Sequence, residues 1–422
     1  MSSQVSFQQD SLPDAPTRFA VDEAKPQSWP PRPSRFWSGV LKPLANRYAR
    51  KTWKVMEVKV DGLAEAYAKF SPNDGVMLAP NHSFEGDAHV LLRAADSIRR
   101  RFYFMADWRA FRGLWGIKGW ILQRMGVFSV DRDGSDRQAL KHAQELLATG
   151  QSLVVFPEGE IHHLNARLMP LLDGVAFMAH GAQQQLVKAK SDATVWIVPA
   201  AIRYRFCEDI RPELEQAMST LEKRMFWTRP PQGASLRQRI LHFADILLTI
   251  KEKEKLGRSS DADGDLPTRI RLLMEALLTR HEQTYLNNKT PAKTVTLRVK
   301  ALRRCLTDLC TNDESDEAAK TAAKSALEDV QLALQLYSYP GNYIEDDDSV
   351  EAMAETLEKF FEDIFSVALC IGHRRAHIVF GEPISLREAS GVGRTRAVIE
   401  KVTDDLEGRM IELLAKTGEG EW

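Results

Sequence analysis

Cysteine is scarce in this sequence, with four residues among 422. Their small number and irregular spacing argue against a disulfide framework. Cys305 and Cys310 lie five residues apart in a segment with helical periodicity, but no His or Cys stands near them at the spacing of a zinc site. We therefore interpret them as small buried apolar side chains and expect no metal ion there.

Long apolar runs and a surplus of one charge are also missing. No stretch approaches the ~18 apolar residues that cross a bilayer. The N-terminus lacks a charged start followed by an apolar run, so no secretory signal is expected. The formal net charge is -1, so overall charge indicates neither nucleic acid nor any other charged partner. These absences predict a cytoplasmic protein that can reach a membrane only from its surface.

Short apolar runs alternate with helical patterns in the first half of the chain. Apolar runs without polar alternation are typical of strands covered on both faces. Strands that alternate with helices indicate a mostly parallel sheet. The predicted strands span 54–60, 75–80, 151–156 and 195–198, and the predicted helices span 88–101, 137–148 and 174–186.

The pattern changes after Cys207 and returns near the C-terminus. Residues 208–372 have helical periodicity almost throughout, and a strand at 375–380 and a helix at 398–416 follow. We therefore predict an α/β fold, a mostly parallel sheet flanked by helices and interrupted by a large all-helical insertion. Residues 34–207 and 373–422 would form the α/β domain and 208–372 the insertion, and the polar, proline-bearing residues 1–33 a disordered tail. No internal repeat is found at the usual solenoid periods.

The segment from Ser34 to Lys54 is basic and rich in large apolar side chains. It contains no acidic residue, and Pro43 is expected to kink or restart a helix there. A basic segment that carries Trp and Phe suits a lipid interface. A helix packed on the domain, with its basic face in solvent, fits the same pattern, so both interpretations stay open.

The segment from Arg99 to Arg132 also mixes cations with aromatics. It has eight basic and two acidic residues. Aromatic residues lie among them, including Phe102, Tyr103, Phe104, Trp108, Phe111, Trp115 and Trp120. We interpret it as a second membrane-facing segment. Nucleic-acid binding and a core of aromatics with arginines outside are the alternatives.

A histidine and an aspartate follow the predicted strand 75–80. His82 lies just past the strand end, where open α/β sheets bind their ligands, and Asp87 comes five residues later. If a helix starts near Ser83, the His82 ring can fold back towards the Asp87 carboxylate. The carboxylate can then fix the imidazole tautomer, and the imidazole can take a proton from an alcohol near neutral pH.

Two more strand ends carry polar groups. Phe156-Pro157-Glu158-Gly159 forms a turn that holds a glutamate at the same edge of the sheet. The apolar segment that starts at Gly126 ends in Arg132, which could bind a phosphate through two hydrogen bonds. An ion pair with Asp131 or Glu158 is the alternative for this arginine.

The order of these blocks resembles the glycerolipid acyltransferase family, typified by bacterial 1-acylglycerol-3-phosphate acyltransferase. The blocks are Asn81-His82-x4-Asp87, Gly126 to Arg132, Phe156-Pro157-Glu158-Gly159 and Val198-Pro199. The resemblance covers residues 56–205 and extends to the strand 375–384, but not to the tail or the helical insertion.

The resemblance implies an O-acyltransferase of phospholipid biosynthesis on the membrane surface. His82 would be the general base that deprotonates the acceptor hydroxyl, and Asp87 would orient it. The acyl group would pass from acyl-CoA or an acyl carrier protein to a glycerolipid such as a lysophospholipid, with no metal or bound cofactor. The implied substrate-binding residues are Asn81, Arg132, Phe156, Pro157, Glu158 and Gly159, with Arg132 on the acceptor's phosphate.

The sequence departs from the family pattern at two cationic positions. The family's third block usually continues Thr-Arg-Ser, but here Ile161 stands where that arginine is expected. Further on, Asp173 precedes Gly174 where the family tends to have lysine, although Arg167 could substitute for one of the two cations. An acceptor without a phosphate, a plain lipid alcohol, is therefore the alternative substrate.

Two other interpretations involve the same residues or the insertion. Glu158, Glu160 and His162 alternate and would share a face as metal ligands in an extended segment, but the family pattern explains Glu158 without a metal. The other rival is a non-catalytic lipid-binding or scaffold protein whose function lies in the insertion.

Overall fold

The computed structural model describes residues 26–418, except for 113–115, 133, 135, 226–231, 258–263, 287–293, 313–314, 347–348 and 391–394. The chain forms two compact units. Glu208–Gly372 belong to one unit, and Lys25–Cys207 with His373–Trp422 belong to the other. None of the described helices is both long and apolar enough to span a bilayer.

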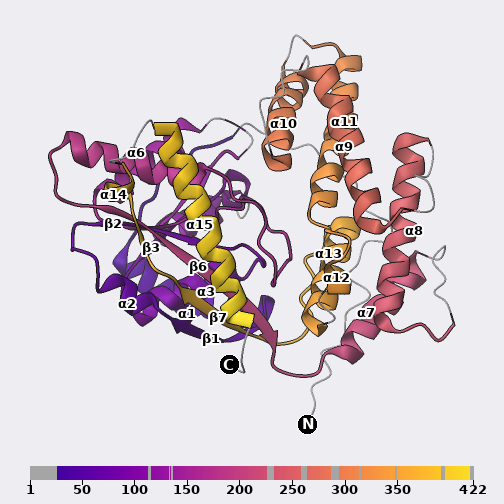
Figure 1. The fold of residues 1–422 in the computed structure, drawn as a ribbon, viewed down its shortest axis with the longest axis horizontal. Coiled ribbons are helices and arrows are strands. Elements are labelled where there is room, and N and C mark those ends of the chain that lie inside the picture. The colour runs from indigo at the N-terminus through magenta and orange to yellow at the C-terminus, as the bar shows by residue number, and fades with distance from the viewer. Residues whose placement is uncertain are drawn as a thin grey trace. The chain divides into compact units, whose positions relative to one another are not determined.

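One sheet organises the α/β unit (Figure 1). Its strand order is β1-β7-β6-β2-β5-β3-β4, and β8 pairs with β6. Neighbouring strands are parallel, except that β6 is antiparallel to both β7 and β8. The strands are β1 (Val55–Asp61), β2 (Gly75–Pro80), β3 (Phe102–Asp107), β4 (Val127–Val130), β5 (Ser152–Val154), β6 (Val195–Phe206), β7 (Arg374–Phe380) and β8 (Ile384–Ser385). The predicted fold class, a mostly parallel α/β sheet with a helical insertion, is confirmed.

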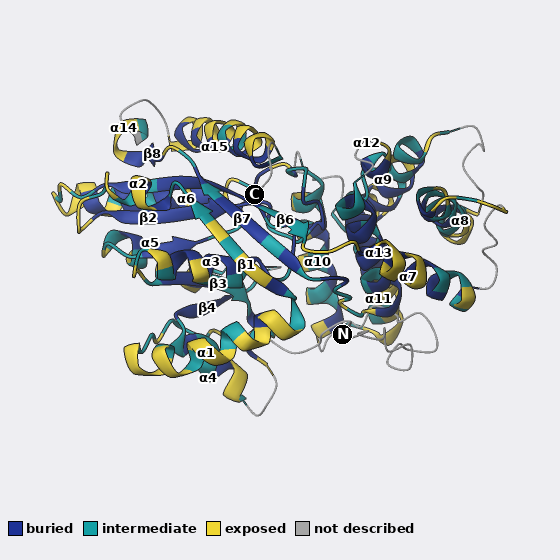
Figure 2. Ribbon diagram, turned by 90° about the horizontal axis from the view of Figure 1, so that it is seen from below, coloured by how far each residue is buried: buried dark blue, intermediate teal, exposed yellow. Residues whose placement is uncertain are grey.

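Helices cover both faces of this sheet. From β2 to β3 the chain crosses the sheet towards the β4 edge. From β4 to β5, and from β5 to β6, it crosses in the opposite direction, towards the β1 edge. Right-handed crossovers then put α3 on the opposite face from α5 and α6. The helices of the unit are α1 (Arg35–Thr52), α2 (Leu63–Tyr67), α3 (Asp87–Ser97), η2 (Trp108–Phe111), α4 (Ile117–Arg124), α5 (Arg137–Ala148), α6 (Gly174–Lys188), α14 (Leu386–Ser390) and α15 (Thr395–Gly418). Side chains of the central strands and of the inner sides of α5, α6 and α15 form the main core. In Figure 2 the buried parts of the sheet are dark blue, whereas much of β1 is yellow, the colour of exposed residues.

The aromatic segment after α3 is part of the core. Phe102–Asp107 form strand β3, which the sequence did not predict, and Phe102, Phe104 and Phe111 are buried. Tyr103 and Trp108 are buried as well, while Trp115 lies outside the described residues. The interpretation of these buried aromatics as membrane-facing is therefore wrong. The cations on either side of this strand led to the membrane interpretation, but the aromatics of the strand itself are buried.

The end of the predicted disordered tail is ordered. The backbone of Trp29 pairs with Ser129 of β4: the Trp29 amide donates to the Ser129 hydroxyl and the Ser129 amide to the Trp29 carbonyl, at 2.8 and 3.0 Å. The Arg32 amide also donates to Gln123, and the Trp29 ring stacks on Phe111. Disorder across 1–33 is thus wrong for this stretch, because it covers the outer edge of β4. Residues 1–25 lie outside the described part of the chain.

The helical unit packs long helices around a core of leucine, valine and alanine side chains. Its helices are α7 (Arg211–Arg224), α8 (Leu236–Leu256), α9 (Leu266–Tyr285), α10 (Val295–Thr311), α11 (Glu317–Tyr337), α12 (Tyr343–Asp346) and α13 (Val350–Phe365). Ser235, Asp265 and Thr294 cap α8, α9 and α10 by accepting a backbone N–H in the first turn. Asp265 lies 30 residues after Ser235, and Thr294 lies 29 residues after Asp265.

The same spacing recurs in a polar clamp between successive helices. An arginine four residues after each cap reaches back to two carboxylates on the preceding helix. Arg239 binds Glu215 and Glu222, Arg269 binds Asp245 and Glu252, and Arg298 binds Glu275 and Glu282. The unit thus contains a repeat of about 30 residues, and the prediction of no internal repeat is wrong for α7 to α10. The repeat is carried by a few polar residues in each helix.

Replacement of Arg269 by alanine should destabilise the helical unit by about 3–5 kcal/mol, because it leaves a buried carboxylate without its cation. Glu252 is fully buried and accepts from Arg269 at 2.8 Å. Hydrogen exchange of α8 and α9 peptides, read by mass spectrometry, measures this loss. The exposed Arg271 on the same helix supplies the control R271A. Equal protection in the two variants would contradict the clamp.

Candidate active site

His82 and Asp87 meet in the loop between β2 and α3. The Asp87 carboxylate oxygen Oδ2 lies 2.9 Å from Nδ1 of His82. The same oxygen accepts the backbone N–H groups of Ser83 and Phe84, at 2.9 and 3.1 Å. Helix α3 begins at Asp87, one residue before the predicted helix 88–101, so His82 lies in the turn before the helix. The Asp87 carboxylate binds the backbone amides of that turn.

The second Asp87 oxygen binds a residue that the sequence analysis did not identify. The Tyr204 hydroxyl donates to Oδ1 at 2.6 Å. Asp87 is completely buried, and Tyr204 is 3% exposed. A buried carboxylate needs such donors, because burial without partners disfavours its charge. Here the four donors hold both oxygens in place.

The His82 ring is fixed on its other side by Phe156. The two rings stack with their centroids 3.8 Å apart and their planes 14° from parallel. Because Nδ1 faces the Asp87 carboxylate, it carries the hydrogen, and Nε2 retains a lone pair. About a fifth of the His82 side chain, 19%, is exposed, so a reactant can reach the ring. The arrangement can take a proton at Nε2 and stabilise the resulting imidazolium.

Glu158 ties the loop after β5 to the His82 backbone. Its Oε1 accepts the His82 amide at 2.7 Å, and its Oε2 accepts the Met169 amide at 2.9 Å. Burial raises the pKa of Glu158 to about 8; the two backbone hydrogen bonds oppose that shift and the nearby Asp87 charge adds to it. Since β2 and β5 are neighbours in the sheet, this glutamate joins two adjacent strand ends.

Pro157 and Gly159 shape the turn that presents Glu158. The Gly159 amide donates to the Phe156 carbonyl, and the Pro157 carbonyl accepts from Leu172. Gly159 has φ +81°, and a Cβ there would stand 2.6 Å from a methyl carbon of Leu172. The positive φ favours glycine at this position, and any side chain there would also displace the Leu172 methyl group.

Asn81 braces strand β6 in this structure. Its amide donates to the Ile202 carbonyl at 3.0 Å and accepts the Ile202 N–H at 2.7 Å. The residue is 1% exposed. The residue that the resemblance assigns to substrate binding therefore holds the edge of the sheet beside the site.

Arg132 lies at the end of β4 and forms an ion pair with Glu160. Its Nη2 is 2.9 Å from Oε2 of Glu160, and its side chain is 37% exposed. The predicted alternative of an ion pair for this arginine is supported, with Glu160 as a partner that the sequence did not suggest. Glu158 and Glu160 thus have different partners.

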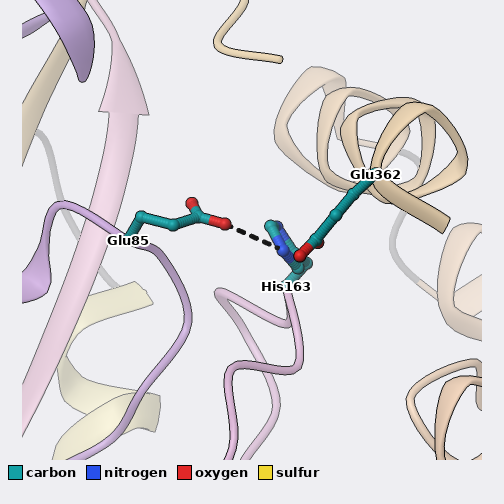
Figure 3. Close-up of side chains that lie close together, drawn as sticks. All are labelled: Glu85, His163 and Glu362. Atoms are coloured by element: carbon teal, nitrogen blue, oxygen red, sulfur yellow. Dashed lines mark ion pairs between the residues drawn. The ribbon is translucent and has the colours of Figure 1, made fainter. Parts of the chain in front are cut away.

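The loops after β2 and β5 also meet through Glu85 and His163. The His163 Nε2 lies 3.3 Å from a carboxylate oxygen of Glu85, as the dashed line in Figure 3 marks. His163 has φ 53°, an uncommon conformation for a residue with a Cβ. This contact and the Glu158–His82 hydrogen bond join the same two loops.

Part of the α/β unit matches a known protein family. Residues 57–203 match the model of the family described as Acyltransferase, a segment that includes all the residues predicted for the site. A search of the curated proteins found no match.

Proposed function

Since residues 57–203 match the acyltransferase family, that of the glycerolipid acyltransferases, we propose that this chain transfers a fatty acyl group from a thioester to the hydroxyl of a lipid, with His82 as the general base. The observation that carries the proposal is the 2.9 Å contact between His82 Nδ1 and the buried Asp87 carboxylate. It leaves Nε2, on a partly exposed ring, as the atom that takes the proton.

The reaction follows from that arrangement. Nε2 of His82 accepts the proton of the acceptor hydroxyl while the oxygen attacks the thioester carbonyl. The ester C–O bond forms, the C–S bond breaks, and the imidazolium returns its proton to the leaving thiolate. Asp87 stabilises the imidazolium between these steps, as a carboxylate does in a catalytic triad. The donor is acyl-CoA or an acyl-carrier-protein thioester, so no metal ion or bound cofactor takes part.

His82→Ala should lower kcat by about 10²–10⁴-fold, because general-base catalysis contributes that much. The measurement is acyl transfer from a purified acyl thioester to a lipid alcohol, followed by chromatography of the product. The control is His142→Ala on α5, which removes an imidazole from the same unit away from the site. Full activity in the His82 variant would sink the proposal. A wild-type protein without any transfer activity would favour the scaffold alternative.

The acceptor is a glycerolipid. The environment of Arg132 indicates whether that glycerolipid has a phosphate group. A phosphate that bound Arg132 would compete with Glu160 for the guanidinium. Ile161, where the family usually has an arginine, adds no charge. These two features favour an uncharged lipid alcohol, such as a monoacylglycerol, over a lysophospholipid.

An acceptor panel tests this preference with two variants of the ion pair. Arg132→Ala should change KM for a monoacylglycerol less than twofold, since an uncharged acceptor makes no contact that needs the cation. Glu160→Gln should lower KM for lysophosphatidic acid severalfold, because it releases the guanidinium for a charged hydrogen bond. A wild-type preference for lysophosphatidic acid that Arg132→Ala abolishes, with KM raised tenfold or more, would contradict the choice of acceptor.

Helix α1 supplies a surface that suits peripheral membrane association. Phe36, Val40, Leu44 and Tyr48 recur every four residues, and they are 71%, 48%, 61% and 54% exposed. Side chains four apart lie on one face of a helix. The helix ends with Arg50 and Lys51 and has no acidic residue; in Figure 2 it is largely yellow, the colour of exposed residues. An exposed apolar stripe with basic neighbours fits an anionic bilayer.

The double variant Phe36→Ser/Leu44→Ser should bind phosphatidylcholine–phosphatidylserine vesicles at least tenfold more weakly than the wild-type protein, since each side chain would lose burial worth about 1.5–3 kcal/mol. Vesicle sedimentation measures the loss. Val187→Ser/Ile411→Ser is the matched control, because these side chains are 51% and 53% exposed on other helices. The membrane assignment fails if the two double variants bind alike.

A further inference from the structure

Tyr204 has no role in the family blocks, yet it touches the catalytic pair. The family match ends at residue 203, one position before it. Its hydroxyl donates to Asp87 Oδ1 at 2.6 Å, while His82 Nδ1 lies against the opposite oxygen Oδ2. Asp87 is thus held between the tyrosine and the histidine.

The backbone of Tyr204 is fixed on both sides. Strand β2 pairs with β6 only as far as Pro80 and Ala200, so the next residues of β6 lose a partner strand on that side. Two asparagine side chains replace it. Asn81 exchanges two hydrogen bonds with Ile202, and Asn165 exchanges two with Tyr204, at 2.7 and 2.8 Å.

On the other side β7 pairs antiparallel with this part of β6, and Tyr204 lies opposite Ala376. The two amides therefore extend the support of β6 as far as Tyr204. The sheet therefore fixes the position of the Tyr204 hydroxyl, because strand β6 has hydrogen-bond partners on both of its sides at this point.

The surroundings keep the Tyr204 hydroxyl protonated. Burial and the negative charge of Asp87 raise the pKa of Tyr204 well above its ordinary value of about 10, and the hydrogen bond to Asp87 adds to this. The charged groups that face it are Asp87, Glu85 and Arg374, and the Arg374 guanidinium lies over the Phe84 ring at 4.4 Å. The hydroxyl therefore acts as a donor to the carboxylate throughout the neutral range.

We propose that Tyr204 is a positioning residue for acyl transfer. By donating to Asp87 Oδ1, its hydroxyl keeps Oδ2 directed at His82 and reduces the negative charge of the carboxylate next to the imidazole. That charge determines how readily His82 releases its proton. The proposal rests on the proposed function of His82. It assigns to strand β6 a part of the catalytic machinery that the four sequence blocks do not contain.

Loss of the hydroxyl has a directional consequence. Without the tyrosine donor the Asp87 carboxylate faces the imidazole with more charge, and it stabilises the imidazolium more strongly. His82 would then stay protonated to a higher pH, and a protonated base cannot act. Tyr204→Phe should therefore move the acid limb of the kcat/KM profile to higher pH, with the loss of activity largest below neutral pH.

The experiment compares Tyr204→Phe with a matched control over pH 5.5–9. Tyr67 also donates its hydroxyl, to Ser152 at 2.7 Å, in the same unit and away from His82. We expect kcat/KM of Tyr204→Phe to fall about tenfold at pH 6 and much less at pH 8.5, a shift of about one pH unit. Tyr67→Phe should keep the wild-type profile, even if its thermal stability falls.

A second measurement separates this inference from the proposed function. Titration of the His82 ring by NMR, with His82→Ala to identify the signal, should show the same upward shift in Tyr204→Phe whether or not the protein transfers acyl groups. Asn165→Ala should shift the titration in the same direction if Tyr204→Phe does not fold. An unchanged titration, or an activity loss equal at every pH, would overturn the role of Tyr204 while leaving that of His82 intact.

Discussion

The site depends on one buried carboxylate. Asp87 is inaccessible to solvent, and its two oxygens accept hydrogen bonds from His82, from two backbone amides and from Tyr204. A buried carboxylate without such partners would favour its neutral form, and it could not then support an imidazolium. The loop after β2, the start of α3 and the end of β6 are all held by this group.

The sheet brings these partners to the carboxylate. Strands β2 and β5 are neighbours, so the His82 loop and the Glu158 turn meet at one edge. Glu158 then joins the loops through the His82 backbone, and Phe156 stacks on the ring. On the other side of β2, strand β6 continues past Pro80 and carries Tyr204 to Asp87. The chemistry of the site therefore follows from the order of three strands.

Much of this could be predicted from the sequence. The apolar run 75–80 forms β2 in full, and the spacing of His82 and Asp87 gave the pair that lies in contact. Strand β3 was missed because three arginines precede its aromatics and the segment was interpreted as a membrane-facing one, although its first half is buried. Tyr204 was missed because the predicted strand stopped before Pro199. The strand continues to Phe206 by pairing with β7, and two asparagine side chains bind its other side.

The most direct test of the account is the stoichiometry of the reaction. Purified protein would receive acyl-CoA and a lipid alcohol on vesicles, and free thiol and new ester would be counted in the same sample. The account predicts one ester for each thiol released, with thiol release dependent on the alcohol. Thiol release matched by free fatty acid instead of ester, or no reaction with any acyl thioester and lipid alcohol, would contradict acyl transfer by this site.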